Sequence, residues 1–317
     1  MRLVAALAFL LLTIAAARAA SFDCAKAASP REKTVCADSA LSKADEQMAA
    51  AYRDALAATL DPFALRRDQR AWLTLLDSPN DPTHDYAAAY TNRIELLTKM
   101  AAGWKALTRS FAADKLASAC FTTPEIDSDQ TCKVEETGKV AGDPKLVYQL
   151  QGIYDDTLRM DGGTVIFAPG ADGMLIPVVT AVSDTTHFYR PSVVTSGAGT
   201  LLWLPGYMEG TGNFNGEQLY LRVGTGWRDV DQVSWEDALA RRLPKDLYVA
   251  KGVYPNYKTM TAITPLWSRS RDGNCCPTGG RADIKLSLKG TTIVLEGVRV
   301  TVGEKAADSA TQPVKEK

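Results

Sequence analysis

Histidine is scarce in this sequence, and its scarcity narrows the chemistry that the chain can perform. Only His84 and His187 occur among 317 residues. A hydrolytic triad needs a histidine beside its nucleophile, and neither residue lies in such a motif. The nucleophile motif Gly-x-Ser-x-Gly is also missing from the sequence. We therefore interpret His84 as a loop residue and His187 as a strand residue, and we predict no catalytic residues.

The sequence also lacks an excess of charge and a recognisable metal site. Lysine and arginine number 36 against 37 aspartates and glutamates, so there is no basic surface typical of nucleic-acid binding. Cys275 and Cys276 have no second close pair of cysteines or histidines, which argues against zinc. Asp127-Ser128-Asp129 begins like a calcium loop, but Cys132 stands where that loop needs glycine. We predict neither a metal nor a cofactor.

Long apolar runs are missing after the first twenty residues. At the start, Arg2 is followed by the apolar stretch Leu3–Ala17 and by the small residues of Ala17-Arg18-Ala19. This order is typical of a cleaved signal peptide. The apolar stretch is shorter than the roughly 20 residues of a membrane-spanning helix. Residues 1–19 are therefore predicted to be a signal peptide, the mature chain to have no membrane span, and the protein to be periplasmic or secreted.

Six cysteines follow the predicted signal peptide: Cys24, Cys36, Cys120, Cys132, Cys275 and Cys276. An even number of cysteines in an exported chain indicates disulfide bonds, although many pairings are possible. Cys24 and Cys36 are twelve residues apart, as are Cys120 and Cys132. The equal spacing favours two local disulfides.

The pairing of Cys275 and Cys276 stays open. They lie in the string Asn274–Gly280 between two candidate strands. They could form a redox-active or vicinal pair, they could each pair elsewhere, or they could belong to an exposed rigid turn. We favour a structural role, because the Cys-x-x-Cys helix context of a redox motif is missing.

The first part of the mature chain has a helical pattern. Ser29-Pro30-Arg31-Glu32 is a capping box with proline at the first helical position. Asp38 can cap a second helix, whose apolar residues recur at steps of three and four. Asp61-Pro62 restarts the pattern. We predict helices over about 30–36, 39–60, 62–76 and 85–107.

From Lys145 onward, short β-rich runs alternate with turn residues. One helix interrupts them, with Ser234 as its cap, Asp237 completing a capping box and Pro244 after its end. Candidate strands are 146–150, 164–167, 175–182, 188–194, 201–204, 218–223, 248–253 and the hairpin 284–288 with 292–300.

These patterns predict an α+β protein. A helical domain over 20–108 is followed by a larger β-rich domain over 109–302, and 303–317 is expected to be a disordered tail. Aromatic residues of the β-rich part could line a sugar or peptide groove, although core or turn packing is commoner. They are Trp203, Tyr207, Phe214, Tyr220 and Trp227.

Several strings of the helical part resemble the LprI-like lysozyme-inhibitor N-terminal domain over about 22–100. They are Phe22–Ala27, Glu32–Asp38, Ala51–Arg53, Gln69–Leu73 and Arg93-Ile94. The resemblance implies an exported helical domain with a Cys24–Cys36 bond and, in one class of members, inhibition of animal-type lysozyme. The family's second cysteine pair, around the loop before the last helix, is missing here. The matched Asp23, Lys26, Arg70 and Trp72 are interpreted as structural.

We therefore expect an exported, non-enzymatic binding protein of the periplasm or cell envelope. Its expected partner is a lysozyme or another envelope protein. The alternative is a glycan-, peptide- or lipid-binding protein of the envelope, in which the helical part is only a docking module. A hydrolase ranks third. A buried polar cluster in a deep pocket would favour an enzyme, and a broad exposed apolar patch would favour binding.

Overall fold

The computed structural model describes residues 20–78, 85–126, 129–184 and 186–302. Four sequence predictions fall outside these residues and stay predictions. They concern the signal peptide over 1–19, the tail over 303–317, the loop residue His84, and Asp127 and Ser128 of the string that begins like a calcium loop.

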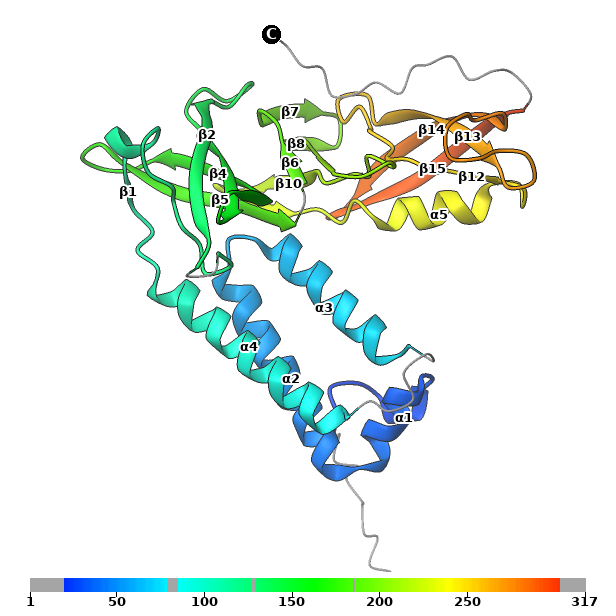
Figure 1. Cartoon of the computed structure of the whole chain (residues 1–317), viewed down its shortest axis with the longest axis horizontal. Coiled ribbons are helices and arrows are strands. Elements are labelled where there is room, and N and C mark those ends of the chain that lie inside the picture. The colour runs from blue at the N-terminus through cyan, green and yellow to red at the C-terminus, as the bar shows by residue number, and fades with distance from the viewer. Residues whose placement is uncertain (1–19, 79–84, 127–128, 185, 303–317) are drawn as a thin grey trace, which may run out of the picture. The chain divides into compact units, whose positions relative to one another are not determined.

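The N-terminal region is helical, as the sequence predicts (Figure 1). A short 3₁₀ turn at Cys24–Lys26 precedes α1 (Pro30–Ala37), α2 (Ser39–Ala58), α3 (Pro62–Leu76) and α4 (Tyr86–Ala106). The predicted capping box starts α1. The Ser29 hydroxyl accepts from the Glu32 backbone N–H at 3.1 Å, and the Glu32 carboxylate accepts from the Ser29 N–H at 3.0 Å. Asp38 caps α2 by accepting from the Ala40 N–H at 2.7 Å.

The chain forms two compact units that do not divide at one position. The first comprises the described residues up to Ala57 together with Ala71–Ala101. The second comprises Ala58–Arg70 together with the described residues from Ala102 onward. The start of α3 therefore belongs to the β-rich unit, whereas the sequence predicts a single division near residue 108.

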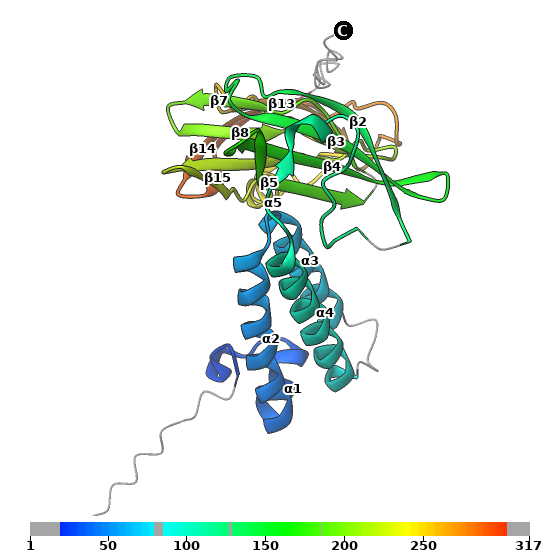
Figure 2. The same cartoon turned by 90° about the vertical axis from the view of Figure 1, so that its left-hand side faces the viewer.

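The second unit is built from antiparallel sheets (Figure 2). The largest has the order β1-β5-β4-β3-β2, with β1 (Phe111–Ala112), β2 (Thr131–Lys139), β3 (Val147–Asp155), β4 (Leu158–Pro169) and β5 (Met174–Asp184). The next has the order β11-β10-β8-β7, with β7 (Ser192–Ser196), β8 (Gly199–Leu204), β10 (Gln218–Val223) and β11 (Gly226–Asp229). The third has the order β12-β13-β14-β15, with β12 (Leu247–Tyr248), β13 (Thr261–Ser268), β14 (Gly280–Lys289) and β15 (Thr292–Thr301). A small ribbon pairs β6 (Thr186–Phe188) with β9 (Gly206–Met208).

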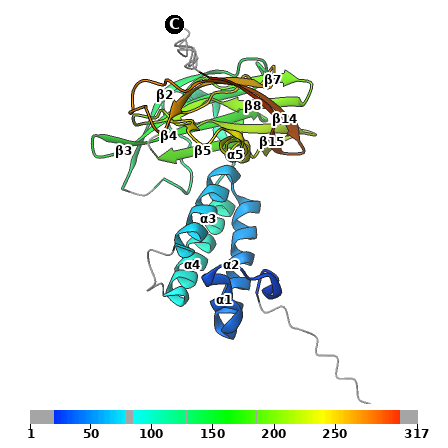
Figure 3. The same ribbon diagram turned by 90° about the vertical axis from the view of Figure 1, so that its right-hand side faces the viewer.

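The sheet containing β8 and β10 contributes to two hydrophobic cores. Leu201 and Leu219 are buried in a core with α5 (Ser234–Arg242) and strands β13 to β15. Their neighbours Leu202 and Tyr220 are buried in the core shared with the five-stranded sheet. Successive side chains of a strand point to opposite faces. Both faces of this sheet are therefore covered, and α5 packs beside β15 (Figure 3).

Two strand predictions are corrected by the structure. The run 188–194 is not one strand, since β6 ends at Phe188 and β7 begins after Pro191, which has no backbone N–H to donate. The run 248–253 is strand only at Tyr248. Beyond it, Gly252 packs against the preceding loop, where an added Cβ would lie 2.3 Å from the Asn213 carbonyl oxygen. Strands β1, β2, β9, β11 and β13 were missed, and β13 contains Pro265, a residue that argues against a strand.

The predicted cap of α5 is also wrong. Ser234 is the first helical residue, and the residue before it, Val233, already has helical dihedral angles and forms no side-chain cap bond. Asp231 supplies the cap. Its carboxylate accepts from the backbone N–H groups of Val233 and Ser234 at 3.0 and 3.2 Å, and from the Ser234 hydroxyl at 2.6 Å.

The structure contains two disulfides, Cys24–Cys36 and Cys120–Cys132. These are the pairings that the equal spacing favours. Cys275 and Cys276 are free and exposed, with their sulfur atoms 2.7 Å apart.

Candidate functional site

The first unit is organised around a buried hydrogen-bond network. Asp45 on α2 is only 1% exposed and accepts from the Tyr90 hydroxyl of α4 at 2.9 Å. The Tyr90 oxygen accepts from Arg31 Nη1 of α1 at 3.3 Å, and Arg31 Nε donates to Asp77 at 3.2 Å. Burial raises the pKa of Tyr90 to about 12, so its hydroxyl stays protonated. The network fixes the helices to one another and leaves its polar groups paired.

Trp72, which the sequence analysis interprets as structural, packs against the same hydrogen-bond network. The Trp72 ring packs edge-on against the Tyr90 ring, with 5.3 Å between centroids. The guanidinium of Arg93 lies 5.5 Å from the centroid of the Trp72 ring. By contrast, two leucines of this unit face solvent, Leu75 at 63% exposure and Leu96 at 47%.

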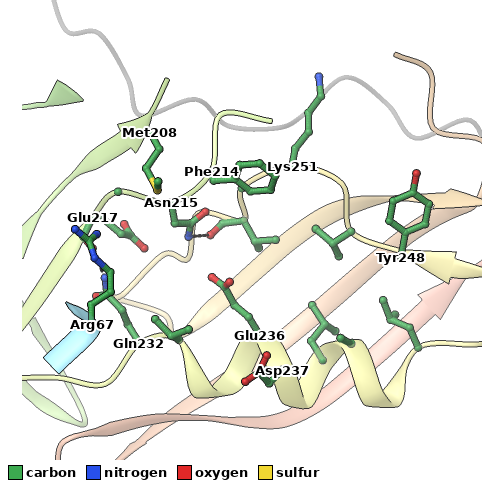
Figure 4. A pocket seen from close by; sticks show the side chains of 18 of the residues that line it. Arg67, Met208, Phe214, Asn215, Glu217, Gln232, Glu236, Asp237, Tyr248 and Lys251 are labelled. Atoms are coloured by element: carbon green, nitrogen blue, oxygen red, sulfur yellow. Dashed lines mark hydrogen bonds between the residues drawn. The ribbon is translucent and has the colours of Figure 1, made fainter. Parts of the chain in front are cut away.

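The second unit contains a pocket of about 410 Å³ (Figure 4). One wall is a single face of α5, because Glu236, Leu239, Ala240 and Leu243 follow the three- and four-residue steps of a helix. The segment 247–253, which follows α5, supplies another wall. The start of α3 and the 214–217 segment before β10 complete the lining.

Glu217 is buried in this pocket and is enclosed by donors. It is 2% exposed, and its carboxylate accepts from the Tyr257 hydroxyl at 2.6 Å and from Trp203 Nε1 at 2.7 Å. Burial raises its pKa to about 7, although the hydrogen bonds from Tyr257, Trp203 and Asn215 oppose the shift. Both carboxylate oxygens are therefore occupied within the protein.

Glu236 is a second carboxylate of the pocket and, unlike Glu217, is not enclosed by hydrogen-bond donors of the residues that the structure describes. It extends from α5 into the cavity, and the next residue, Asp237, also belongs to the lining (Figure 4). Burial raises the pKa of Glu236 to about 7, and the negative charges of Glu217 and Asp237 contribute to the shift. None of the described residues donates a hydrogen bond to its carboxylate.

Two amide oxygens of the pocket lining are also buried without a hydrogen-bond donor among the described residues. They belong to Gln232, which is 5% exposed, and to Asn215. The amide nitrogens are engaged, since Gln232 Nε2 donates to the Glu217 carbonyl and Asn215 Nδ2 to the Val253 carbonyl.

The cations that line the pocket have partners of their own. Arg67 Nη2 donates to the Ser183 hydroxyl at 3.0 Å. The Arg269 guanidinium lies 4.7 Å from the Tyr248 ring centroid. Lys251 is exposed and extends away from α5 (Figure 4). The interior end of the cavity is therefore rich in acceptors.

A comparison with family models identifies the helical region. Residues 24–112 match the model described as Lysozyme inhibitor LprI. This region is LprI-like. No curated protein matches the chain.

The LprI-like region contains the features on which the sequence resemblance rests. It includes the Cys24–Cys36 disulfide and all four N-terminal helices. In the part of the chain that the structure describes, no helix is long and apolar enough to cross a membrane. The same described residues contain no cluster of three potential metal ligands.

The five aromatic residues of the β-rich part that could line a groove do not gather at this pocket. Only Phe214 lines the pocket, while Trp203 reaches it through its bond to Glu217. Tyr220 is buried in a core, and Tyr207 stacks on His187 with 5.2 Å between ring centroids. His187 is a strand residue, as predicted, and it contacts Glu209.

Sequence reasoning missed Glu217 and Glu236. One signal was present for Glu236, which shares a helical face with Leu239, Ala240 and Leu243 and interrupts its apolar character. No local signal marks Glu217, because its partners come from residues 203 and 257, distant in the sequence.

The pocket does contain the buried polar cluster that would favour an enzyme. However, paired-carboxylate hydrolysis needs two carboxyl groups that can reach the substrate. Glu217 has both oxygens engaged by Tyr257 and Trp203, so only Glu236 is open to a ligand. With Glu217 engaged, the pocket does not offer the pair Glu217 and Glu236 to such hydrolysis.

Proposed function

We propose that the chain is an exported binding protein of the periplasm or cell envelope whose LprI-like region inhibits a lysozyme or another wall-active protein. The observation that carries the proposal is the family match over residues 24–112. The matched family is one of inhibitors rather than enzymes. The paired network of Arg31, Asp45 and Tyr90 supports a rigid binding surface.

Inhibition would act by blocking access to the lysozyme cleft. A stable block needs an interface of about 1,200–2,000 Å² in total, with a few large side chains as anchors. Leu75 and Leu96 are the exposed large apolar residues among those of the first unit that the structure describes. They are therefore the first positions to test for contact with the partner.

Electrostatic steering should be weak. Asp45 and Asp61 are buried, at 1% and 2% exposure, and cannot attract a basic lysozyme. The exposed Asp54 is offset by its neighbour Arg53. Inhibition should therefore depend only modestly on ionic strength.

The test uses the mature chain, beginning at Ala20, in an assay of animal-type lysozyme on bacterial cell walls. We expect saturable inhibition at micromolar protein, weakened by Leu75→Asp or Leu96→Asp. The pocket variant Glu236→Gln is the matched control and should inhibit normally. A folded chain that does not inhibit would overturn the lysozyme assignment.

N-terminal sequencing of the exported protein tests the compartment, and an intact Met1 there would contradict cleavage.

A further inference from the structure

The pocket of the second unit has no part in the proposed inhibition, yet its polar groups are arranged for a ligand. Its lining includes Glu236, Gln232 and Asn215, and the amide oxygens of Gln232 and Asn215 are buried there. None of these oxygens accepts a hydrogen bond from a residue that the structure describes. A buried acceptor without a donor is costly, because it has lost its hydrogen bonds to water. A ligand that fits this end must therefore donate hydrogen bonds.

The charge of the site favours a cationic donor over a neutral one. The charged groups that shift the pKa of Glu236 are Glu217 and Asp237, both negative. A positive group beside Glu236 would relieve this repulsion and supply the missing donors together. A protonated amine carries three such donors.

The remaining walls favour an apolar body for the ligand. Phe214, Leu239, Leu243 and Val249 line the cavity. Its volume of about 410 Å³ lies in the range of small-molecule sites, which are mostly apolar with a few placed polar groups. An aromatic or branched aliphatic body would fill this space and exclude water from the charged end.

We propose that this pocket binds a small organic cation, a primary ammonium group carried on an apolar or aromatic body. The ammonium group lies at Glu236, beside Gln232 and Asn215 of the same lining. Glu217, enclosed by Tyr257 and Trp203, adds negative charge without contacting the ligand. The proposal goes beyond lysozyme inhibition and does not depend on it.

The site should bind such a ligand better when Glu236 is ionised. Because its pKa is about 7, the carboxylate is mostly protonated at mildly acidic pH and mostly ionised above neutrality. The other charged groups that line the pocket come from several elements: Arg67 of α3, Glu217 before β10, Asp237 of α5, and Lys251 and Arg269 on either side of β13. Burial also raises the pKa of Glu217 to about 7, so its ionisation adds to that of Glu236 over the same range.

The experiment is calorimetric titration of the mature chain with 3-phenylpropylamine, at about pH 8.5 and about pH 5.5. The uncharged isostere 3-phenylpropan-1-ol is titrated in parallel. We expect the amine to bind about tenfold more tightly at the higher pH. The alcohol should bind more weakly than the amine, without this pH dependence.

Two matched variants test whether the carboxylate that binds the amine is that of Glu236. Glu236→Gln should weaken amine binding about tenfold at pH 8.5 and leave only the smaller pH dependence that comes from the ionisation of Glu217. Asp237→Asn removes the same charge from the next residue of α5, an exposed residue of the pocket lining, and should weaken binding less than about threefold. Thermal unfolding of each variant checks that it is folded.

Three outcomes would overturn the proposal. Amine and alcohol could bind equally, Glu236→Gln could retain tight amine binding, or the folded parent chain could show no saturable amine binding. The lysozyme assay is unaffected by any of them, so the two proposals fail separately.

Discussion

Glu236 is a carboxylate in an unfavourable place, since burial and like charges both oppose its ionisation. Residues held in this way are uncommon in stable cores, because a well-packed apolar or neutral side chain would cost less. The pH dependence of unfolding should reveal the cost.

Replacement of Glu236 by glutamine should stabilise the protein at high pH. Its pKa is about 7 in the folded state against an ordinary value of 4.5, so the folded chain retains a proton that the unfolded chain releases. Stability therefore falls as pH rises between these values. Glu236→Gln should raise the free energy of unfolding by about 2–3 kcal/mol at pH 8 and give no gain near pH 4. Urea unfolding of the parent chain and the variant at the two pH values measures this difference. A loss of stability at pH 8 in the variant would contradict the prediction.

Tyr90 is a second residue whose role can be isolated. Tyr90→Phe removes the donor to Asp45 and the acceptor for Arg31 while leaving the ring in contact with Trp72. Unfolding should become easier by about 1–3 kcal/mol, because buried charged groups lose a partner. Tyr52→Phe, in the same unit, is the control and should change stability by less than about 0.5 kcal/mol. Equal losses of stability in the two variants would contradict a stabilising role for the hydrogen-bond network of Tyr90.

Helix starts were predictable where their signals are local. The capping box at Ser29 and the cap at Asp38 lie within a few residues of the helices they start. The start of α5 was mispredicted because Ser234 was interpreted as the cap, whereas Asp231, three residues earlier, accepts from the first backbone N–H groups. Strand β13 was missed because Pro265 argues against it locally, although the residue is held opposite Arg281 of β14.

The cap of α5 can be tested by two substitutions. Burial raises the pKa of Asp231, but the donors of Ser234 and Val233 outweigh it and leave the pKa lowered. The ionised cap therefore stabilises α5 above the ordinary pKa and is lost as pH falls through the lowered value. Asp231→Ala should cost about 1 kcal/mol at neutral pH, and Ser234→Ala should cost less. Chemical unfolding measures the loss of stability in both variants. A larger loss for Ser234→Ala than for Asp231→Ala would indicate that Ser234 is the cap.

At the scale of the whole molecule, the change from a helical to a β-rich part was predictable from residue periodicity. The membership of residues 58–70 in the second unit was not. Their partners lie more than a hundred residues later in the chain, where Asp61 accepts from the Val182 N–H at 2.9 Å and Arg66 pairs with Asp229 at 2.7 Å. The pocket was unpredictable for the same reason, since its lining joins 63, 67 and 208–269.

The disulfide of the first unit should contribute to the stability of the whole chain. Replacing Cys24 and Cys36 together by serine should lower the free energy of unfolding by about 2–4 kcal/mol, as expected for a short closed loop. Replacing Cys275 and Cys276, which are exposed and unbonded, is the control and should have little effect. Guanidinium unfolding compares the double variants. Peptide mapping that joined Cys24 to another cysteine would contradict the pairing.

Residues 58–70 also limit how the LprI-like region can be moved into another protein. A segment excised to the bounds of the family match, 24–112, would carry Leu60, Asp61 and Arg66 away from the groups that pair with them at Thr180, Val182 and Asp229. Phe63 and Leu65, buried in the intact chain, would face water in such a graft. Residues 24–112 alone are therefore not expected to fold as a separate unit in another protein. Fusion proteins and chimaeras should keep the β-rich unit attached, or replace these residues with polar ones.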